Sequence, residues 1–241
     1  MKVIAIIPAR YDSTRFPGKP LAKLGNKYII QHVYEQAIKS GLFADVIVGT
    51  DDQRIFEAVN SFNGNVVLTS KKHKSGTDRV AEVCGKILSC KDADVIINVQ
   101  GDEPFINEDP LRMLIEAFND KSVQVASLMH VIYKDIEDPN NVKVVCDNYG
   151  NALYFSRSVI PYTKISKGEY YKHIGVYAFR RQALFEFVEL PESKLEKLEK
   201  LEQLRLLENG YKIRMVLTSY KGIGIDTPED LKNAENLLKT I

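Results

Sequence analysis

Residues 3–20 read VIAIIPARYDSTRFPGKP, an apolar run of strand length that passes directly into a loop rich in proline and charge. The run 3–7 contains only apolar side chains, which is typical of a strand covered on both faces. The loop behind it holds Arg10, Arg15 and Lys19, with Asp12 as its only acid. A solvated loop needs neither this charge nor these prolines, so the stretch raises the question of what the loop binds.

Short apolar runs alternate with segments of helical periodicity through the first half of the chain. The predicted strands are 3–7, 45–50, 65–69 and 94–99. The predicted helices are 28–41, 53–62, 77–90 and 109–118, with Gly41 as a terminator and Asp109-Pro110 as an N-cap and first-turn pair. This alternation predicts an α/β fold with a doubly wound, mostly parallel sheet. Ligands bind such sheets outside the carboxyl ends of the strands, where the loop 8–20 and the motifs TDD (50–52) and QGDEP (100–104) lie.

The alternation of predicted strands and helices stops after about residue 120. The predicted strands 124–133, 142–147, 152–156 and 171–179 are separated only by turns, and 147–151 has the composition of a hairpin turn. A helix is predicted over 193–210, with Ser193 and Glu196 in capping-box spacing and Gly210 at its end, and the chain closes with a strand over 211–219 and a helix from Thr227. No linker separates these parts, so we expect one domain over 1–241 with a β-rich extension over about 120–180.

Composition excludes several classes of protein. Lys and Arg number 33 against 32 Asp and Glu, a balance that argues against a nucleic-acid-binding protein. No stretch has the roughly 18 apolar residues of a membrane span. The three cysteines fit neither a disulfide framework nor a C-x-x-C pair, which favours a reducing compartment. We therefore expect a cytoplasmic protein that contacts neither membranes nor nucleic acid.

The loop 8–20 has the chemistry of an anion site. Arginine presents a planar fork that matches phosphate or carboxylate oxygens, lysine adds a compact charge, and Ser13 and Thr14 are small donors. The prolines reduce the entropy lost when such a loop is ordered around a ligand. Neither G-x-G-x-x-G nor a P-loop motif is present, which weakens dehydrogenase and P-loop readings. The alternative is a solvated loop with incidental charges.

Seven blocks of the sequence resemble, in order, those of the cytidylyltransferases that activate 3-deoxy-manno-octulosonate (Kdo). They are IPARYDSTRFPGKPL (7–21), SGTDR (75–79), INVQGDEP (97–104), ALYFSRSVIPY (152–162), HIGVYAFR (173–180), LEKLEQLR (198–205) and GIDTPEDL (224–231). The resemblance implies a Rossmann-like, glycosyltransferase-A-like nucleotidyltransferase sheet. It also implies an enzyme that transfers CMP from CTP to the anomeric hydroxyl of Kdo and releases pyrophosphate.

The resemblance also assigns residues to the nucleotide and the metal. It makes Arg10, Arg15, Lys19 and Asp102 catalytic. The implied nucleotide-binding residues are Ala9, Arg10, Ser13, Thr14, Arg15, Lys19, Ser75, Gly76, Arg79 and Gln100. Asp102 and Asp226 would hold Mg²⁺, which takes one or two carboxylates and fills its shell with water and phosphate oxygens. Read without the resemblance, Asp226 merely precedes a capped helix, and Thr77-Asp78 reads as a helix cap.

The implied sugar-binding residues are Gln100, Arg157, His173, Tyr177, Glu202 and Gln203. On a strand, His173 and Tyr177 project to the same face. On a helix over 193–210, Glu202 would lie in an apolar stripe with Leu198 and Leu206, where a carboxylate needs a partner. That partner could be a ligand, or a structural arginine or histidine. Alternatives also stay open for Arg157, as a solvent-facing strand arginine, and for His173, as a satisfied core histidine.

Two features depart from the relatives' pattern. Tyr162, Thr163 and Lys164 stand where a tryptophan and a further basic residue are usual, and the loop 164–170 is short. The alternatives to a Kdo enzyme are a cytidylyltransferase for another acidic sugar, of the sialic-acid type, and a nucleotide sensor without catalysis. The motif STRFPGKP favours Kdo, and the presence of both Asp102 and Asp226 disfavours the sensor. The resemblance further implies a homodimer, built partly by the β-rich extension, that serves lipopolysaccharide biosynthesis.

Overall fold

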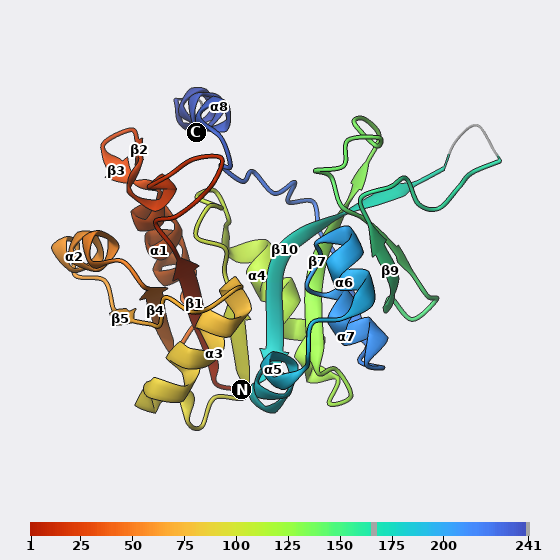
Figure 1. Ribbon diagram of the computed structural model, residues 1–241, viewed down its shortest axis with the longest axis horizontal. Helices are drawn as coiled ribbons and strands as arrows, with labels where there is room; N and C mark the ends of the chain where they lie inside the picture. Colours follow the sequence, from red (N-terminus) through yellow and green to blue (C-terminus); the bar gives the residue numbers. More distant parts are fainter. Residues whose placement is uncertain (165–167, 240–241) are drawn as a thin grey trace. The chain divides into compact units, whose positions relative to one another are not determined.

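Residues 1–164 and 168–239 of the chain are described by a computed structural model (Figure 1). The chain divides into two compact units, one formed by residues 1–111 with 222–241 and the other by residues 112–221. The segment predicted as a β-rich extension, about 120–180, lies within the second unit. The prediction of one domain over 1–241 stays a prediction.

The first unit is built on a parallel sheet. Its strands are β1 (Val3–Ala9), β4 (Asp45–Thr50), β5 (Val66–Leu68) and β6 (Val95–Asn98). β1 lies between β6 and β4, β4 pairs with β5, and every pairing is parallel. Residues Ile4 to Ile7 have no exposed surface. The predicted α/β class and parallel sheet are therefore confirmed, and the burial of β1 explains its apolar sequence.

Helices follow the strands of the first unit as predicted, with small shifts at their ends. They are α1 (Ile29–Lys39), α2 (Gln53–Ser61), α3 (Gly76–Lys86) and α8 (Pro228–Leu238), and α4 (Glu108–Glu116) spans the division between the units. Gly41 takes a positive φ of 64° after α1, as its predicted role requires. Asp109 lies inside the first turn of α4 and is not its N-cap. The helix predicted over 77–90 ends at Lys86, and Leu88–Cys90 form a separate 3-10 turn, η2.

The end of the chain packs against its beginning. The 3-10 turn η1 (Lys19–Leu21) leads into a ribbon of β2 (Lys23–Leu24) and β3 (Lys27–Tyr28), which was not predicted. α8 lies beside this ribbon (Figure 1), and Leu24, Ile225 and Ala234 form a shared buried cluster. This cluster fixes the segment before α8 next to the loop that follows β1.

The second unit carries the predicted β-rich pattern. Its strands are β7 (Val125–Ile132), β8 (Lys143–Cys146), β9 (Ala152–Ser156), β10 (Tyr170–Arg180) and β11 (Ile213–Leu217). β10 pairs antiparallel with β7 and β8, β8 pairs antiparallel with β9, and β11 runs parallel to β7. Its helices are η3 (Ala117–Asn119), α5 (Arg181–Glu189), α6 (Lys194–Glu199) and α7 (Leu204–Glu208).

A bulge in β10 changes which of its residues face β7. His173 pairs with Met129, but Tyr177 rather than Gly175 pairs with Ser127. Because two extra residues are inserted, the side-chain alternation is preserved, and the rings of His173 and Tyr177 lie with centroids 5.2 Å apart. The prediction that these two side chains share a face is confirmed.

The prediction of one continuous helix over 193–210 is wrong. The capping box of Ser193 and Glu196 forms, but α6 ends at Glu199 because Lys200 adopts the left-handed conformation, with φ 54°. Leu198 is 71% exposed, so the apolar stripe proposed around Glu202 does not exist. A second carboxylate of this region, that of Glu196, is buried as an ion pair, with its Oε1 2.6 Å from Nη2 of Arg205, while Oε2 of Glu202 is buried as the sequence predicted.

Candidate active site

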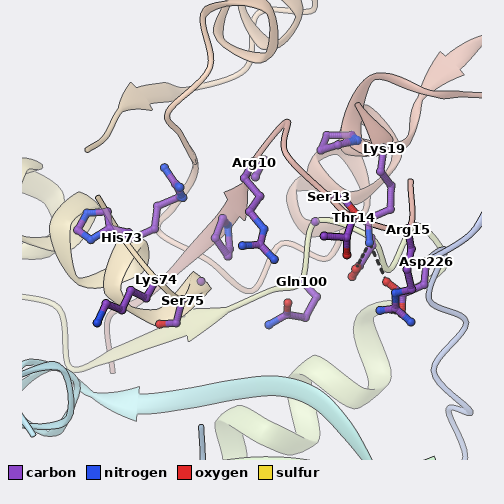
Figure 2. Close-up of a pocket in the computed structure, with 17 residues that line it drawn as sticks. Arg10, Ser13, Thr14, Arg15, Lys19, His73, Lys74, Ser75, Gln100 and Asp226 are labelled. Atoms are coloured by element: carbon purple, nitrogen blue, oxygen red, sulfur yellow. Dashed lines mark hydrogen bonds and ion pairs between the residues drawn. The ribbon is translucent and has the colours of Figure 1, made fainter. Parts of the chain in front are cut away.

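A pocket of about 340 Å³ opens in the first unit, where loops follow the carboxyl ends of β1 and β6 (Figure 2). All ten residues predicted to bind nucleotide line it: Ala9, Arg10, Ser13, Thr14, Arg15, Lys19, Ser75, Gly76, Arg79 and Gln100. Asp102 and Asp226, predicted to hold the metal, line it as well. The structure therefore brings together residues that are separated by more than 200 positions in the sequence.

Lys19 is the centre of a charge cluster in this pocket. Its Nζ lies 2.6 Å from Oδ2 of Asp102 and 3.0 Å from Oδ1 of Asp226, and Nη2 of Arg15 lies 3.0 Å from Oδ2 of Asp226. Burial by itself would lower the pKa of Lys19, but the two carboxylates outweigh it and raise that pKa above its ordinary value. Lys19 is therefore a firmly charged ammonium, and the acids of the cluster hold two of the loop's three cations together.

Asp102 and Asp226 are aligned by backbone as well as by charge. Asp102 follows β6, and Asp226 directly precedes Thr227, the N-cap of α8. The backbone N–H of Ile225 donates to the carbonyl oxygen of Asp102 at 2.9 Å, which joins the two loops next to their carboxylates. The capping predicted for the Asp226 segment and the convergence of Asp226 on the pocket thus occur together.

The loop after β1 is closed by its own contacts. Gly18 has a φ of 71°, and its N–H donates to the carbonyl oxygen of Tyr11 at 2.9 Å. A Cβ at Gly18 would approach the Tyr11 ring to 3.0 Å, so glycine is required for both conformation and space. The guanidinium of Arg54 lies 3.3 Å from the centre of the Tyr11 ring, and Asp52 holds Arg54 through two hydrogen bonds. These contacts set the place of Arg10 and Arg15.

The N-terminus of α3 forms another wall. Ser75 is its N-cap, with its Oγ accepting from the N–H of Asp78 at 3.1 Å, and the Asp78 carboxylate accepts from the N–H of Ser75. The helix cap predicted at Thr77-Asp78 therefore begins two residues earlier. Gly76 has no side chain to block the pocket, where its backbone lies near the ring of Pro8.

Arg79 lines the pocket but is bound to the protein. Only 3% of its surface is exposed, its Nη2 lies 2.9 Å from Oδ2 of Asp51, and its Nη1 donates to the hydroxyl of Thr69. Asp51 follows β4 and Thr69 follows β5, so Arg79 fastens α3 to two strand ends. Gln100 follows β6 and donates through Nε2 to Oδ1 of the buried Asn98 at 3.3 Å.

His73 and Lys74 line the pocket and were not predicted. His73 Nε2 bonds to the carboxylate of Glu82, which also accepts from the N–H of Ser70 at 2.9 Å and lies 2.5 Å from the Lys86 ammonium. Burial alone would raise the pKa of Glu82, but these donors outweigh burial and lower that pKa to about 2. The basic run KKHK (71–74) directly before SGTDR was the available signal for these residues.

Two predicted sugar-binding residues in the second unit have buried atoms that lack a partner. Within residues 1–164 and 168–239, Oη of Tyr177 and Nε2 of Gln203 are buried without a hydrogen-bond partner. Burial, and secondly the charge of Glu202, raise the pKa of Tyr177 well above its ordinary value. Buried polar atoms left unbonded are rare in native proteins, and the hydroxyl groups of a sugar could bond them.

His173 is partly buried, and its imidazole is uncharged. Its Nε2 lies 2.9 Å from Oγ of Ser127, which also lies within hydrogen-bond distance of the Ile174 and Val176 carbonyl oxygens in the bulge. Burial lowers the pKa of His173 to about 3. The hydrogen bond to Ser127 fits the interpretation of His173 as a satisfied histidine, and its ring also contacts that of Tyr177, while its role in sugar binding stays a prediction.

Arg157 is occupied by backbone carbonyls. Its Nε donates to the backbone carbonyl oxygen of Glu199 at 2.8 Å, and its Nη1 donates to the backbone carbonyl oxygen of Pro139 at 2.9 Å. Its Nη2 lies 3.5 Å from the backbone carbonyl oxygen of Lys200. It is thus not the solvent-facing arginine of the alternative reading. Tyr162 is 86% exposed and Lys164 is exposed, and residues 165–167 of the loop predicted to be short lie outside the described residues.

Two features are absent from the described residues. No helix of residues 1–164 or 168–239 is long and apolar enough to cross a membrane. The same residues contain no group of three or more His, Cys, Asp and Glu side chains placed to hold a metal ion. The predicted pair of Asp102 and Asp226 has only two carboxylates and is smaller than such a group, so the magnesium site stays a prediction.

Comparison with known proteins gives consistent matches over the chain. A family model described as cytidylyltransferase matches residues 4–213. The 3-deoxy-manno-octulosonate cytidylyltransferase of Bacteroides thetaiotaomicron is 51% identical over 99% of both chains, and that of Thermodesulfovibrio yellowstonii is 50% identical over 100% of this chain and 99% of its own. A solved structure of CMP:2-keto-3-deoxy-manno-octonic acid synthetase in complex with CTP superimposes with a TM-score of 0.94, at 44% identity, over 100% of this chain and 99% of that one.

Proposed function

The chain belongs to the 3-deoxy-manno-octulosonate cytidylyltransferase family, and from this membership we propose that it transfers CMP from CTP to Kdo with the residues that converge on Lys19. The observation that carries the assignment of residues is the cluster of Lys19, Arg15, Asp102 and Asp226 in the pocket. A pocket with cations and carboxylates side by side suits a nucleoside triphosphate bound together with a divalent metal.

In the reaction, the anomeric hydroxyl of Kdo loses its proton to solvent as its oxygen forms a bond to the α-phosphorus of CTP. The bond from that phosphorus to the bridging oxygen of the β-phosphate breaks, and pyrophosphate leaves. No covalent protein intermediate is required, so positioning and charge stabilisation carry the catalysis. We assign the triphosphate to Arg10, Arg15 and Lys19, which would hold the β- and γ-phosphates and stabilise charge on the leaving pyrophosphate.

Asp102 and Asp226 fit the proposed Mg²⁺. Since both carboxylates lie within 3.0 Å of one ammonium nitrogen, they already converge on a single cation. When bound, Mg²⁺ would neutralise phosphate oxygens and lower the pKa of a coordinated hydroxyl. Lys19 and Arg15 are paired with these acids in the structure, and we propose that they exchange the carboxylates for phosphate oxygens when CTP and metal bind.

The remaining nucleotide contacts are assigned to small and backbone groups. Ala9, Ser13 and Thr14 would meet the phosphates or ribose through the loop after β1. Ser75 and Gly76 would meet the cytosine or ribose at the start of α3, supported by the buried Arg79. Gln100, from the same pocket, is assigned to both nucleotide and sugar.

The sugar acid is assigned to the second unit. Tyr177 and Gln203 offer buried polar atoms that lack partners within the described residues, and Glu202 and His173 lie next to Tyr177. A sugar with several hydroxyl groups can supply the missing hydrogen bonds. Arg157 would provide positive charge near this cluster, although its guanidinium is already bonded to three carbonyls.

The biological setting follows from the substrate. We propose that the enzyme works in the cytoplasm and supplies CMP-Kdo for lipopolysaccharide, and its three cysteines form no disulfide in the structure, as suits a reducing compartment. We further propose a homodimer that uses the β-rich segment. Tyr133, Tyr149 and Leu153 in that segment are 74%, 80% and 61% exposed, and such side chains are often buried in an interface. Light scattering after size-exclusion chromatography measures the oligomeric state.

Pyrophosphate release from CTP and Mg²⁺ tests the proposed reaction, with Kdo compared against N-acetylneuraminate. We expect release with Kdo that is lost in Asp102→Asn and kept in Asp92→Asn, which changes an exposed carboxylate of the same unit. Release with only the sialic acid would keep the chemistry and overturn the assigned substrate. Tight CTP binding without release from either sugar would favour a nucleotide sensor.

A further inference from the structure

Lys143, at the start of β8, is among the largest side chains that are completely buried, and it carries a charge. Its Nζ donates to the carbonyl oxygen of Arg157 at 2.7 Å and to that of Asp138 at 3.0 Å. Burial lowers the pKa of Lys143. A buried ammonium is costly, and an apolar side chain of similar size would pack the same space without that cost. We therefore expect the ammonium group of Lys143 to have a function that an apolar side chain could not supply.

Arg157, whose carbonyl accepts from Lys143, binds other backbone carbonyls through its own side chain. The guanidinium of Arg157 donates to the carbonyl oxygens of Glu199 and Pro139 and lies 3.5 Å from that of Lys200. In a continuous helix, the oxygens of Glu199 and Lys200 would accept from N–H groups four residues ahead. Arg157 takes these oxygens, and the helix breaks at Lys200, whose φ is 54°.

The carboxylate of Glu199 fastens the same turn from its other side. Its Oε1 accepts from the hydroxyl of Ser156 at 2.6 Å, and its Oε2 accepts from the backbone N–H of Arg157 at 2.9 Å. Arg157 therefore donates to Glu199 twice. Its backbone N–H bonds the Glu199 carboxylate, and its side chain bonds the Glu199 backbone carbonyl. The turn 199–203 can move only if the end of β9 moves with it.

This turn carries two residues assigned to the sugar. Glu202 and Gln203 follow the break by two and three positions, and the Gln203 side chain is buried with its Nε2 aimed at no partner within the described part of the chain. A short polar side chain on a turn reaches a ligand only if the turn is held in place. Buried polar groups without bonds also tolerate little displacement.

We propose that Lys143 is a positioning residue for the sugar-acid site: its buried ammonium fixes the backbone of Arg157, and Arg157 with Glu199 fixes the turn that presents Glu202 and Gln203. This inference rests on the proposed function. It assigns to Arg157 the placement of sugar-binding residues, and it predicts that disturbing Lys143 weakens Kdo binding while CTP binding, in the other unit, is unaffected.

The test compares Lys143→Met with wild type in two measurements. Methionine keeps a flexible chain of similar length and removes the ammonium. Isothermal titration measures the Kd for CTP, and pyrophosphate release at saturating CTP measures the KM for Kdo. We expect the KM for Kdo to rise about tenfold or more, since small displacements of positioning groups have large effects, and the Kd for CTP to stay within about twofold. Lys212→Met, an exposed lysine of the same unit, is the matched control and should change neither.

Glu199→Gln provides a second variant that leaves the buried lysine intact, in case Lys143→Met does not fold. It weakens the bonds to Ser156 and to the Arg157 N–H, and we expect a rise of several-fold in the KM for Kdo alone. An unchanged KM for Kdo in either folded variant, or an equal loss of CTP and Kdo binding, would overturn the proposal. Wild-type protein that releases no pyrophosphate with Kdo would instead refute the proposed reaction and remove the basis of this inference, so the two failures can be told apart.

Discussion

Replacing Lys19 by methionine leaves two carboxylates facing each other in the pocket of the first unit. Oδ2 of Asp102 and Oδ1 of Asp226 lie 2.6 and 3.0 Å from Lys19 Nζ, so these oxygens are at most 5.6 Å apart. Two unit charges at that distance repel by about 3 kcal/mol at an effective dielectric constant of about 20. Because the Asp102 and Asp226 side chains are 27% and 44% exposed, water screens part of this repulsion. We expect Lys19→Met to lower the free energy of unfolding by about 1–2 kcal/mol.

Thermal unfolding at low salt measures this loss, which corresponds to a fall in Tm of roughly 2–8 °C for a chain of this size. High salt should reduce the loss, and Mg²⁺ should raise the Tm of Lys19→Met more than that of wild type, because the two carboxylates then need a new counterion. Lys23→Met, which removes an exposed lysine beside Tyr28, is the control. A loss that neither salt nor Mg²⁺ reverses, or an equal loss in Lys23→Met, would refute the reasoning.

Arg79→Met should lower the free energy of unfolding by about 3–5 kcal/mol in urea titration, because it leaves the Asp51 carboxylate without its buried partner. His173 has a pKa of about 3 in the folded protein, so its imidazole is neutral there. In the unfolded chain the imidazole takes up a proton below about pH 6.5. The free energy of unfolding of the wild type should therefore fall as the pH drops from about 6.5 toward 3. His173→Gln should make that fall shallower by up to about 1.4 kcal/mol per pH unit in urea titrations across this range, and equal slopes would contradict the assignment. Gly18→Ala should weaken CTP binding by about tenfold in titration calorimetry. The cause is strain of about 1–2 kcal/mol, since φ is 71° and the new methyl group would meet the Tyr11 ring. An unchanged affinity would show that the loop conformation is not needed for CTP binding.

Local signals in the sequence were sufficient for most of the secondary structure. β4 and β9 begin and end at the predicted residues, since each is an apolar or alternating run bounded by turn-forming residues. α8 begins after Thr227 as predicted, because Thr227 and Asp230 complete a capping box within four residues. Strand pattern, cap and terminator all act over a few positions, so they can be read from one sequence.

The helix predicted over 193–210 failed because its break depends on a distant residue. Nothing near Lys200 in sequence stops a helix, and the segment LEKLEKLEQLRLLE is rich in helix-forming residues. The break coincides with hydrogen bonds from Arg157, more than 40 positions earlier. The reasoning about Glu202 inherited this error, since it assumed that Leu198 shares its face, whereas Leu198 is exposed.

The candidate site divides in the same way. Motifs were enough to predict which residues come together in one pocket, because loops after parallel strands meet at one edge of the sheet. They gave no indication of the partners of these residues. Arg79 reads as a nucleotide contact in SGTDR but is bonded to Asp51 and Thr69, and this pairing depends on how α3 packs on β4.

The three cations of the opening loop differ in what holds them. Arg15 and Lys19 are paired with carboxylates of the protein, whereas Arg10 makes no ion pair within residues 1–164 and 168–239. A phosphate that meets Arg10 therefore breaks no existing contact, but a phosphate that meets Lys19 must compete with Asp102 and Asp226. That competition becomes favourable only if another cation takes over the two carboxylates. Triphosphate and divalent metal should accordingly bind Lys19 and its acids together, and neither should bind there strongly without the other.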